Sequence, residues 1–491
     1  MRKTRRIVGL GIALGMSFSG AAAAQPDVTR PNIVFILADD LGYADTTLYG
    51  HTSLYKTPNI QKLADRGVVL SHCWAASPLC SPTRASILTG LYPARIGLTS
   101  PVAHEPKTIL EKGLVSKAEN WQKALPAESL TRLNTTYNTL AEILKKQGYV
   151  TAHFGKWHLG SGKFAPQHHG FDVDVPKWNG PGPGGNYVAP WKNRNFKLPA
   201  QPGEHLEDVM ARQATAFIRE NKDKPFFLNY WAFSVHSPFE AKKQLIADYR
   251  TKIDEKSDQR SPTYAAMVQS LDDAVGTLVS TLDELKLTEK TIVVFVSDNG
   301  GNMYNTVDGV KPTSNAPLRS GKASLYEGGT RVPCIVAMPG TIPPGTRSDG
   351  YFSTVDFLPT LLALSAIPPG NDKIDGLDLS AMLKGQKSAR NEVFCHFPHG
   401  HERQAENIPG SKPGSSLIKN GWKLVRFYCD TPTQESRDEL YDLVKDPSES
   451  QNLAGQQPER LKELAAILQR YLDETKAVIP IKNPNYVLQT K

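Results

Sequence analysis

The feature that most constrains this chain is a repeated succession of short, apolar, β-branched runs that alternate with helical patterns. The clearest run, residues 291–296 (TIVVFV), follows a long amphipathic segment and ends just before Asp298 and Asn299. Comparable runs occupy residues 32–37, 150–154, 226–231 and 331–336. Strands that alternate with helices are typical of an α/β domain with a largely parallel sheet.

Polar side chains stand just after these predicted strands. Adjacent acids or a lone histidine at a strand end usually belong to an ordinary solvated loop. Here such positions recur, and the ligands of open α/β sheets bind at the carboxyl ends of the strands. The sequence therefore predicts one shared site made of Asp39, Asp40, Lys156, His158, His236, Asp298 and Asn299.

Two pairs among these residues have the composition of a metal site. Asp39 and Asp40 follow one predicted strand, and Asp298 and Asn299 follow another. Their side chains offer oxygen ligands only, which suit a hard cation. No cluster of cysteines and histidines has the spacing of a zinc site. The pattern indicates a hard cation, with zinc and magnesium as weaker alternatives.

The pattern of predicted strands and helices changes after about residue 383. Residues 420–427 and 439–443 are short strand candidates with a turn between them. A final amphipathic helix follows, with an apolar face formed by Leu461, Leu464, Leu468 and Tyr471. We expect residues 30–384 to form the large catalytic domain, and residues 385–491 a small α+β subdomain with an antiparallel sheet.

The first 24 residues have the pattern of a secretory signal peptide. A positive start precedes an apolar stretch at residues 7–18, which is too short to span a membrane comfortably. An uncleaved anchor helix is the alternative. We therefore expect export, to the periplasm or outside the cell, and no membrane span in the mature chain.

The net charge limits the kinds of partner and substrate that this chain is expected to bind. The whole chain has a formal charge of +8, and the leader carries four of the positive charges on Arg2, Lys3, Arg5 and Arg6, which leaves +4 for the mature chain. This mild excess does not imply nucleic-acid binding. It slightly favours anionic substrates.

Residues 80–84 (CSPTR) place a cysteine at the start of a predicted helix. Pro82 fits the first turn, where a missing N–H costs nothing. At a helix N-terminus the backbone donors and the dipole favour anions, and Arg84 lies one turn further on. A buried cysteine before a capped helix is the alternative for Cys80 taken alone.

Together with residues 85–90 (ASILTG), this motif resembles the signature of the type I sulfatases, which belong to the alkaline phosphatase superfamily. A second segment, residues 148–158 (GYVTAHFGKWH), is similar to another motif of that family. The resemblance extends from about residue 30 to the C-terminus. It implies an alkaline phosphatase-like fold, with a mostly parallel mixed sheet sandwiched between helices and a small C-terminal subdomain.

The resemblance also implies a modified residue and a metal ion. A formylglycine-generating maturation enzyme would oxidise Cys80 to formylglycine (3-oxoalanine). One calcium ion would be bound by Asp39, Asp40, Asp298, Asn299 and an oxygen of the modified Cys80.

The family's catalytic positions match Cys80, Arg84, Lys156, His158, His236 and Lys322. In the mechanism that the resemblance implies, the hydrated aldehyde attacks the sulfate while His236 and Lys322 face the leaving oxygen. His158 then deprotonates the second hydroxyl, which expels sulfate and restores the aldehyde.

The resemblance implies a sulfuric-ester hydrolase, and export with a mild positive charge fits a sulfated carbohydrate as substrate. A phosphonate or phosphate ester hydrolase of the same superfamily is the first alternative. A catalytically silent glycan-binding protein is the second, although every mechanistic position is filled in this chain.

A Gly- and Pro-rich segment, residues 179–186 (NGPGPGGN), predicts a flexible, exposed loop. His168, His169 and Trp178 flank this loop, and we expect them at the surface, with contact to the substrate as the alternative. The choice of sugar depends on loops such as this one and on the region around His104.

Overall fold

The computed structural model describes Met1 and residues 30–370, 372–400 and 408–488. The predicted signal peptide, apart from Met1, lies outside the described residues. Among the helices that are described, none is long and apolar enough to cross a membrane.

An eight-stranded sheet forms the centre of the large domain, in the order β12-β2-β11-β10-β1-β9-β7-β8. Neighbouring strands are parallel except in the two pairs that include β11, so the predicted mostly parallel, mixed sheet is confirmed. Its strands are β1 (Asn32–Ala38), β2 (Gly67–Leu70), β7 (Val150–Gly155), β8 (Val173–Val175), β9 (Phe226–Trp231), β10 (Thr291–Ser297), β11 (Cys334–Ala337) and β12 (Thr346–Ser348).

The central strand β1 shows why these runs are apolar throughout. Successive side chains of a strand point to opposite faces, and both faces of this sheet are covered. Val34 and Ile36 therefore pack into one hydrophobic core, while Phe35 and Leu37 pack into the other. Strands buried on both faces have continuous rather than alternating hydrophobicity.

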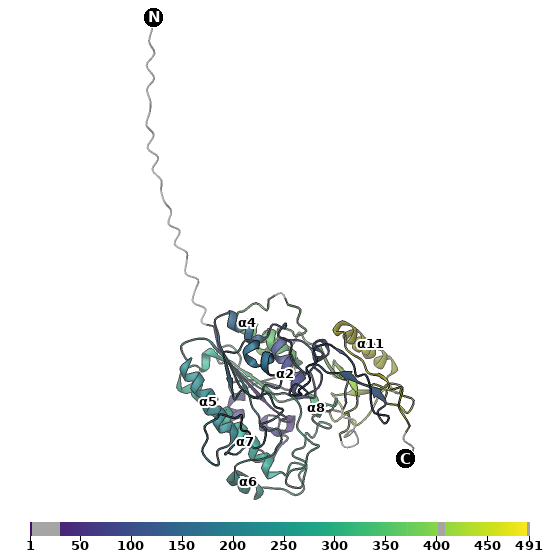
Figure 1. The fold of residues 1–491 in the computed structure, drawn as a ribbon, viewed down its shortest axis with the longest axis horizontal. Coiled ribbons are helices and arrows are strands. Elements are labelled where there is room, and N and C mark those ends of the chain that lie inside the picture. The colour runs from purple at the N-terminus through teal and green to yellow at the C-terminus, as the bar shows by residue number, and fades with distance from the viewer. Residues whose placement is uncertain (2–29, 371, 401–407, 489–491) are drawn as a thin grey trace.

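Helices cover the sheet on both faces (Figure 1). One core contains side chains of α1 (Pro58–Ala64), α5 (Leu206–Glu220), α6 (Lys243–Arg250) and α7 (Pro262–Glu284). The other contains side chains of α2 (Cys80–Thr89), α3 (Pro93–Ile96), α4 (Leu140–Lys146), α9 (Phe357–Leu364) and α10 (Ser380–Leu383).

The strand predicted at residues 331–336 begins later than expected, at Cys334. Pro333 has no N–H to donate to a neighbouring strand, so it cannot continue the hydrogen-bond ladder. The Arg331 side chain is used elsewhere, because its guanidinium donates to the Ser71 carbonyl at 3.0 and 2.8 Å.

A small antiparallel sheet and a helix make up the C-terminal part, which lies at one side of the large domain (Figure 1). The four strands follow one another as a meander, and α11 packs against them. The sequence predicted the third and fourth strands and the helix, and it missed the first two. The elements are β14 (Glu392–Phe397), β15 (Gly414–Lys419), β16 (Trp422–Phe427), β17 (Arg437–Asp442) and α11 (Pro458–Thr475).

Short two-stranded pairs link distant segments. β18 (Ile481–Lys482) near the C-terminus pairs with β5 (Ala124–Leu125), which belongs to a long connection of the large domain. The other pairs are β4 (Gly113–Leu114) with β6 (Ala127–Glu128) and β3 (Cys73–Trp74) with β13 (Phe352–Ser353). The C-terminal segment is thereby fixed to the connection that carries residues 113–128.

Candidate active site

The carboxyl ends of two neighbouring strands bring four polar residues together. β1 and β10 pair in parallel with Ala38 opposite Ser297, so the residues that follow them meet at one edge of the sheet. The Asp40 amide donates to Asp298 Oδ1 over 3.2 Å, and Asn299 Nδ2 donates to Asp40 Oδ1 over 2.9 Å. The four fully buried residues at this edge are Asp39, Asp40, Asp298 and Asn299.

Two oxygens of this group have no donor within the part of the chain that the structure describes. Asp39 Oδ1 and Asn299 Oδ1 are buried and accept no hydrogen bond. An unpaired buried acceptor costs about 1–3 kcal/mol, so two of them in one cluster indicate a position for a ligand. Carboxylate and amide oxygens are the ligands that a hard cation such as Ca²⁺ takes. The donor set therefore fits calcium.

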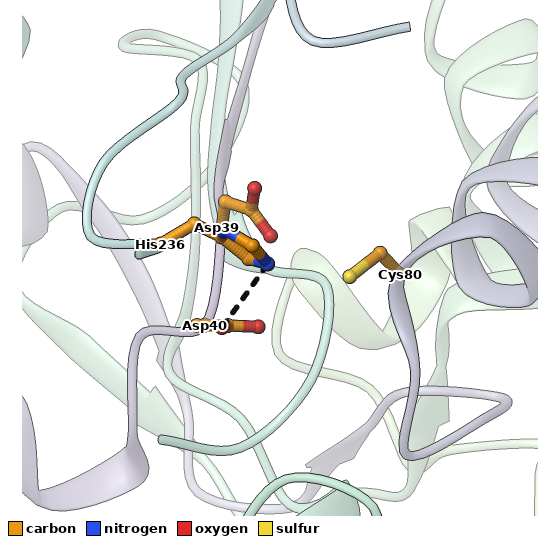
Figure 2. Close-up of side chains that lie close together, drawn as sticks. All are labelled: Asp39, Asp40, Cys80 and His236. Atoms are coloured by element: carbon orange, nitrogen blue, oxygen red, sulfur yellow. Dashed lines mark ion pairs between the residues drawn. The ribbon is translucent and has the colours of Figure 1, made fainter. Parts of the chain in front are cut away.

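Cys80 faces this group from the first residue of α2 (Figure 2). Ligand atoms of Asp39, Asp40, Cys80 and His236 all lie within 4.8 Å of one another. Burial raises the pKa of the Cys80 thiol to about 12, although Lys156 opposes the shift. The thiolate is the nucleophilic form of cysteine, so the unmodified side chain is a poor nucleophile at neutral pH.

Three buried cations surround the carboxylates. Arg84 donates to Asp298 Oδ2 through Nε at 3.0 Å and a terminal nitrogen at 2.8 Å, and its guanidinium lies 5.1 Å from the centre of the Trp231 ring. The remaining contacts are those of Lys156 Nζ with Asp39 Oδ2 at 2.6 Å and of Lys322 Nζ with Asp40 Oδ2 at 2.7 Å.

The charges of this cluster balance in the polypeptide alone. Burial acts to raise the pKa of Asp40, but Lys322 and His236 outweigh it and hold that pKa below its usual value. Burial and Asp39 raise the pKa of Asp298 to about 6, against the effect of Arg84. A divalent cation added to three cations and three carboxylates leaves an excess of positive charge, which is suited to an anionic substrate.

His158 lies in the loop after β7 and contacts a second histidine. Its Nε2 is 2.9 Å from His104 Nδ1, and Ser81 Oγ donates to its carbonyl over 2.7 Å. His158 Nδ1 is buried without a partner among the described residues. Burial, with Lys156 nearby, keeps the pKa of His158 well below its usual value. His158 is therefore a neutral imidazole held by His104.

His236 follows β9 and lies on the other side of the group. Its Nδ1 is 2.7 Å from the Ser237 carbonyl, so this nitrogen is the one that carries hydrogen. Its Nε2 then points to Asp40 Oδ2 at 3.8 Å (Figure 2). Burial and Lys322 lower the pKa of His236 to about 3.

A cavity of about 570 Å³ opens above these residues. Cys80, His158, His236 and Lys322 line it, whereas Arg84 and Lys156 are fully buried beneath it. Sequence reasoning pointed to the region around His104 but missed most of the other wall residues, because they come from loops that only the fold brings together. The rest of the wall includes Ser100, His104, Glu119, Trp121, Gln122 and Tyr304, with Phe397 and His399 from the C-terminal part.

The expectation of an exposed loop at residues 179–186 is wrong in part. Gly182, Pro183 and Asn186 are buried. A Cβ on Gly182 would lie 2.9 Å from the Ser237 carbonyl and 3.1 Å from His236 Nδ1, so the loop packs directly on the site. His169, which we expected at the surface, is also buried, because its ring packs against Trp157.

The fold and this site define a class of protein. A buried cluster of carboxylates and cations lies at the carboxyl edge of a mostly parallel sheet, below a cavity lined by a buried cysteine and, among others, the histidines His158 and His236. This is the arrangement of a hydrolase that acts on anionic esters.

Comparisons with known proteins give the family. A family model described as Sulfatase matches residues 31–367, and one described as N-sulphoglucosamine sulphohydrolase, C-terminal, matches residues 321–477. The chain is 32% identical to N-acetylgalactosamine-6-sulfatase of Canis lupus familiaris, over 96% of this chain and 91% of that protein. It is 33% identical to Arylsulfatase A of Homo sapiens, over 91% of this chain and 88% of that protein.

A solved structure agrees with these relatives. The crystal structure of Ps i-CgsB in complex with k-i-k-neocarrahexaose is 26% identical and superposes with a TM-score of 0.72, covering 94% of this chain and 95% of that one. The chain belongs to the sulfatase family, and it is an enzyme that hydrolyses sulfate esters.

Proposed function

We propose that this sulfatase removes sulfate from a sulfated carbohydrate, using formylglycine made from Cys80 and one calcium ion. The relatives support the substrate class, since one is named for a sulfated amino sugar and a solved relative was crystallised with a neocarrahexaose. The observation that carries the proposal is the pair of buried oxygens that accept no hydrogen bond from any described residue, Asp39 Oδ1 and Asn299 Oδ1, in the cluster that Cys80 faces.

Asp39, Asp40, Asp298 and Asn299, with an oxygen of the modified Cys80, would hold the calcium ion. When bound, the ion supplies Lewis-acid polarisation of a sulfate oxygen. The protein groups around it are buried and already hydrogen-bonded in place, so they need little reorganisation during the reaction.

Formylglycine would provide, as a hydrated aldehyde, the hydroxyl nucleophile that the buried thiol cannot provide. The CSPTR motif at residues 80–84 makes a formylglycine-generating maturation enzyme the partner that this chain requires. The division into residues 30–384 and 385–491, and export to the periplasm or outside the cell, belong to the same proposal.

The remaining residues position the sulfate and move protons. Arg84 and Lys156 supply fixed positive charge beneath the sulfate oxygens. Lys322 and His236 line the cavity beside Cys80, where they face the oxygen of the breaking S–O bond, and the Lys322 ammonium gives that oxygen the proton with which it leaves as the sugar hydroxyl. His158 takes the proton from residue 80 that allows sulfate to depart, and His104 holds the His158 ring.

Mass spectrometry of the peptide that contains residue 80 tests the proposal. Protein co-expressed with a maturation enzyme should hydrolyse 4-nitrophenyl sulfate and carry an aldehyde or its hydrate at residue 80. Cys80→Ala should abolish turnover. Cys395→Ser is a matched control, because Cys395 is also buried, burial also raises its pKa to about 12, and it lies on β14 outside the cavity.

Active protein that carries only the thiol at residue 80 would overturn the proposed nucleophile. A kcat/KM that is higher for 4-nitrophenyl phosphate or a phosphonate ester than for the sulfate ester would favour the superfamily alternative. Binding of sulfated glycans by modified protein that releases no sulfate would favour the glycan-binding alternative.

A further inference from the structure

A second cavity lies next to the one that holds the reactive groups. Its volume is about 560 Å³, within the range of about 300–1,000 Å³ typical of small-molecule sites. The two cavities share His104 and Pro181 in their walls. The second cavity therefore lies beside the reaction cavity, where the next unit of a ligand longer than one sugar would be.

The partition between the two cavities is built from three loops that one side chain ties together. Asn179 Nδ2 donates to the Ala103 carbonyl over 2.9 Å, and Asn179 Oδ1 accepts from the Gly160 amide over 3.0 Å. Ala103 precedes His104, which belongs to both walls. The geometry of the second cavity is thus fixed by its own hydrogen bonds.

An indole forms one wall of the second cavity. Trp178 Nε1 donates to the Gly182 carbonyl over 2.7 Å, and the ring meets Phe196 edge to face with centroids 6.1 Å apart. Both contacts hold the half-buried ring in one orientation. A fixed aromatic face offers apolar area at low entropic cost.

The polar lining suits hydroxyl groups and an acidic substituent. Asp174 is 8% exposed and accepts from Gln167 Nε2 over 3.1 Å. A carboxylate accepts and an amide both donates and accepts, which matches neighbouring sugar hydroxyls. Lys177 is exposed on the rim and adds a positive charge.

We propose that the second cavity binds the neighbouring saccharide unit of the glycan whose sulfated unit occupies the reaction cavity. The inference rests on the proposed function, because it takes the substrate to be a glycan. It assigns Trp178 to the sugar face, Asp174 and Gln167 to its hydroxyls, and Lys177 to a sulfate or carboxylate on that unit. The enzyme then prefers oligosaccharides to single sugars.

Chain-length dependence of kcat/KM tests this proposal. The short probe is 4-nitrophenyl sulfate, and the long probes are oligosaccharides of chondroitin 6-sulfate and of carrageenan. Trp178→Ala should lower the ratio of kcat/KM on the best long probe to kcat/KM on the short probe about tenfold, which corresponds to about 1.4 kcal/mol. Lys177→Ala should lower the ratio severalfold, and because Lys177 is exposed this variant keeps the test valid if Trp178→Ala folds poorly.

Lys163→Ala is the matched control, since Lys163 is an exposed lysine of the same region that does not line the cavity. It should leave the ratio unchanged. An equal ratio in the wild type and both cavity variants would overturn the proposal, as would a wild type that hydrolyses the short probe and gains nothing from any long one. Failure of the proposed function differs, because the wild type would then hydrolyse none of the probes.

Discussion

Two buried arginine–aspartate pairs in this molecule differ in how completely the polar atoms around them are hydrogen-bonded. Arg390 and Asp356 lie where the C-terminal part joins the large domain, and this pair is saturated. Both oxygens of Asp356 accept from Arg390. In addition, Oδ1 accepts from the Leu377 amide and Oδ2 from the Ser353 amide, both over 2.8 Å. Arg390 also donates to the Tyr92 hydroxyl over 3.1 Å. No polar atom of either partner is left over.

Arg84 and Asp298 form an equally buried pair, but not every acceptor beside it is hydrogen-bonded to a described residue. We call this cluster, which includes Asp39 and Asn299, the unfinished region. The surroundings of Arg390 and Asp356 are the saturated region. In the unfinished region, Asp39 Oδ1 and Asn299 Oδ1 have no hydrogen-bond donor within the described chain. Burying charge is costly unless the geometry satisfies every group. A pair that holds the fold meets this condition within the protein. The cluster of Arg84 and Asp298 does not meet it within the described residues, and under the proposed function the ligand completes it; this contrast distinguishes the two regions.

The largest effects are expected when the aspartate of each pair is replaced by asparagine and the two variants are compared in activity and stability. Asp298→Asn should lower kcat/KM about 10²–10³-fold, with a smaller loss of stability, because Arg84 keeps a second carboxylate, that of Asp39, at 3.6 Å. Asp356→Asn should destabilise the protein by about 3–5 kcal/mol, because it leaves Arg390 buried without a carboxylate. Initial rates per folded molecule and urea unfolding measure both. A destabilised Asp298→Asn with normal kcat/KM would contradict the comparison.

Calcium removal is the second test, and only the unfinished region should respond to it. Dialysis against EGTA should abolish activity, and added Ca²⁺ should restore it. A ligand that binds only the folded state at about 100 times its Kd adds roughly 2.7 kcal/mol of stability, so the Tm should rise with Ca²⁺. Asp39→Asn should weaken this Ca²⁺-dependent rise, whereas Asp356→Asn should keep it. A Tm rise of equal size in both variants would place the ion elsewhere.

The strand-end residues of the site and the buried strands could be predicted from the sequence much better than the C-terminal part. The strand-end residues Asp39 and Asp298 could be predicted to meet, because parallel strands place their carboxyl ends on one edge. Their separation of more than 250 residues did not matter. Strands β1, β9 and β10 were predictable because they are buried on both faces, which makes them continuous apolar runs.

The rest depends on long-range packing that has no local signal. β14 and β15 carry polar residues and follow no clean alternation, so their pairing emerges only with β16 and β17 in place. Residues 179–186 have the composition of a solvated loop, but their small side chains allow close packing on His236. His104 and His158 are 54 residues apart, and nothing in either segment indicates their hydrogen bond.

His104 gives a smaller effect within the unfinished region. His104→Gln should lower kcat about tenfold, because outer partners that orient a functional histidine typically contribute 10–100-fold. The pH profile of kcat should change as well, since the ring that neighbours His158 is lost. His168→Gln is the matched control, because His168 is exposed and lines neither cavity. A lower Tm with an unchanged pH profile would mean that His104 has only a structural role.

The smallest effect belongs to the saturated region and concerns pH. His396 lies on β14 in the same C-terminal part as Arg390, with Nδ1 2.7 Å from Ser415 Oγ and Nε2 3.2 Å from the Val478 carbonyl. Burial lowers its pKa to about 4, whereas an unfolded histidine titrates near 6.5. Between pH 4 and 6.5, His396 is therefore protonated in the unfolded chain and neutral in the folded chain. The stabilisation is complete above about pH 6.5 and declines by roughly 1.4 kcal/mol per pH unit as the pH falls toward 4.

Replacing His396 should remove this part of the pH dependence. In urea unfolding at a series of pH values, His396→Gln should flatten the stability curve between pH 6.5 and 4 relative to the wild type, while His168→Gln should leave it unchanged. The expected change is confined to stability, because His396 lies outside the reaction cavity. If His396→Gln instead shifted the pH profile of kcat and kept the stability curve, the separation between a saturated interface and an unfinished site would not hold at this position.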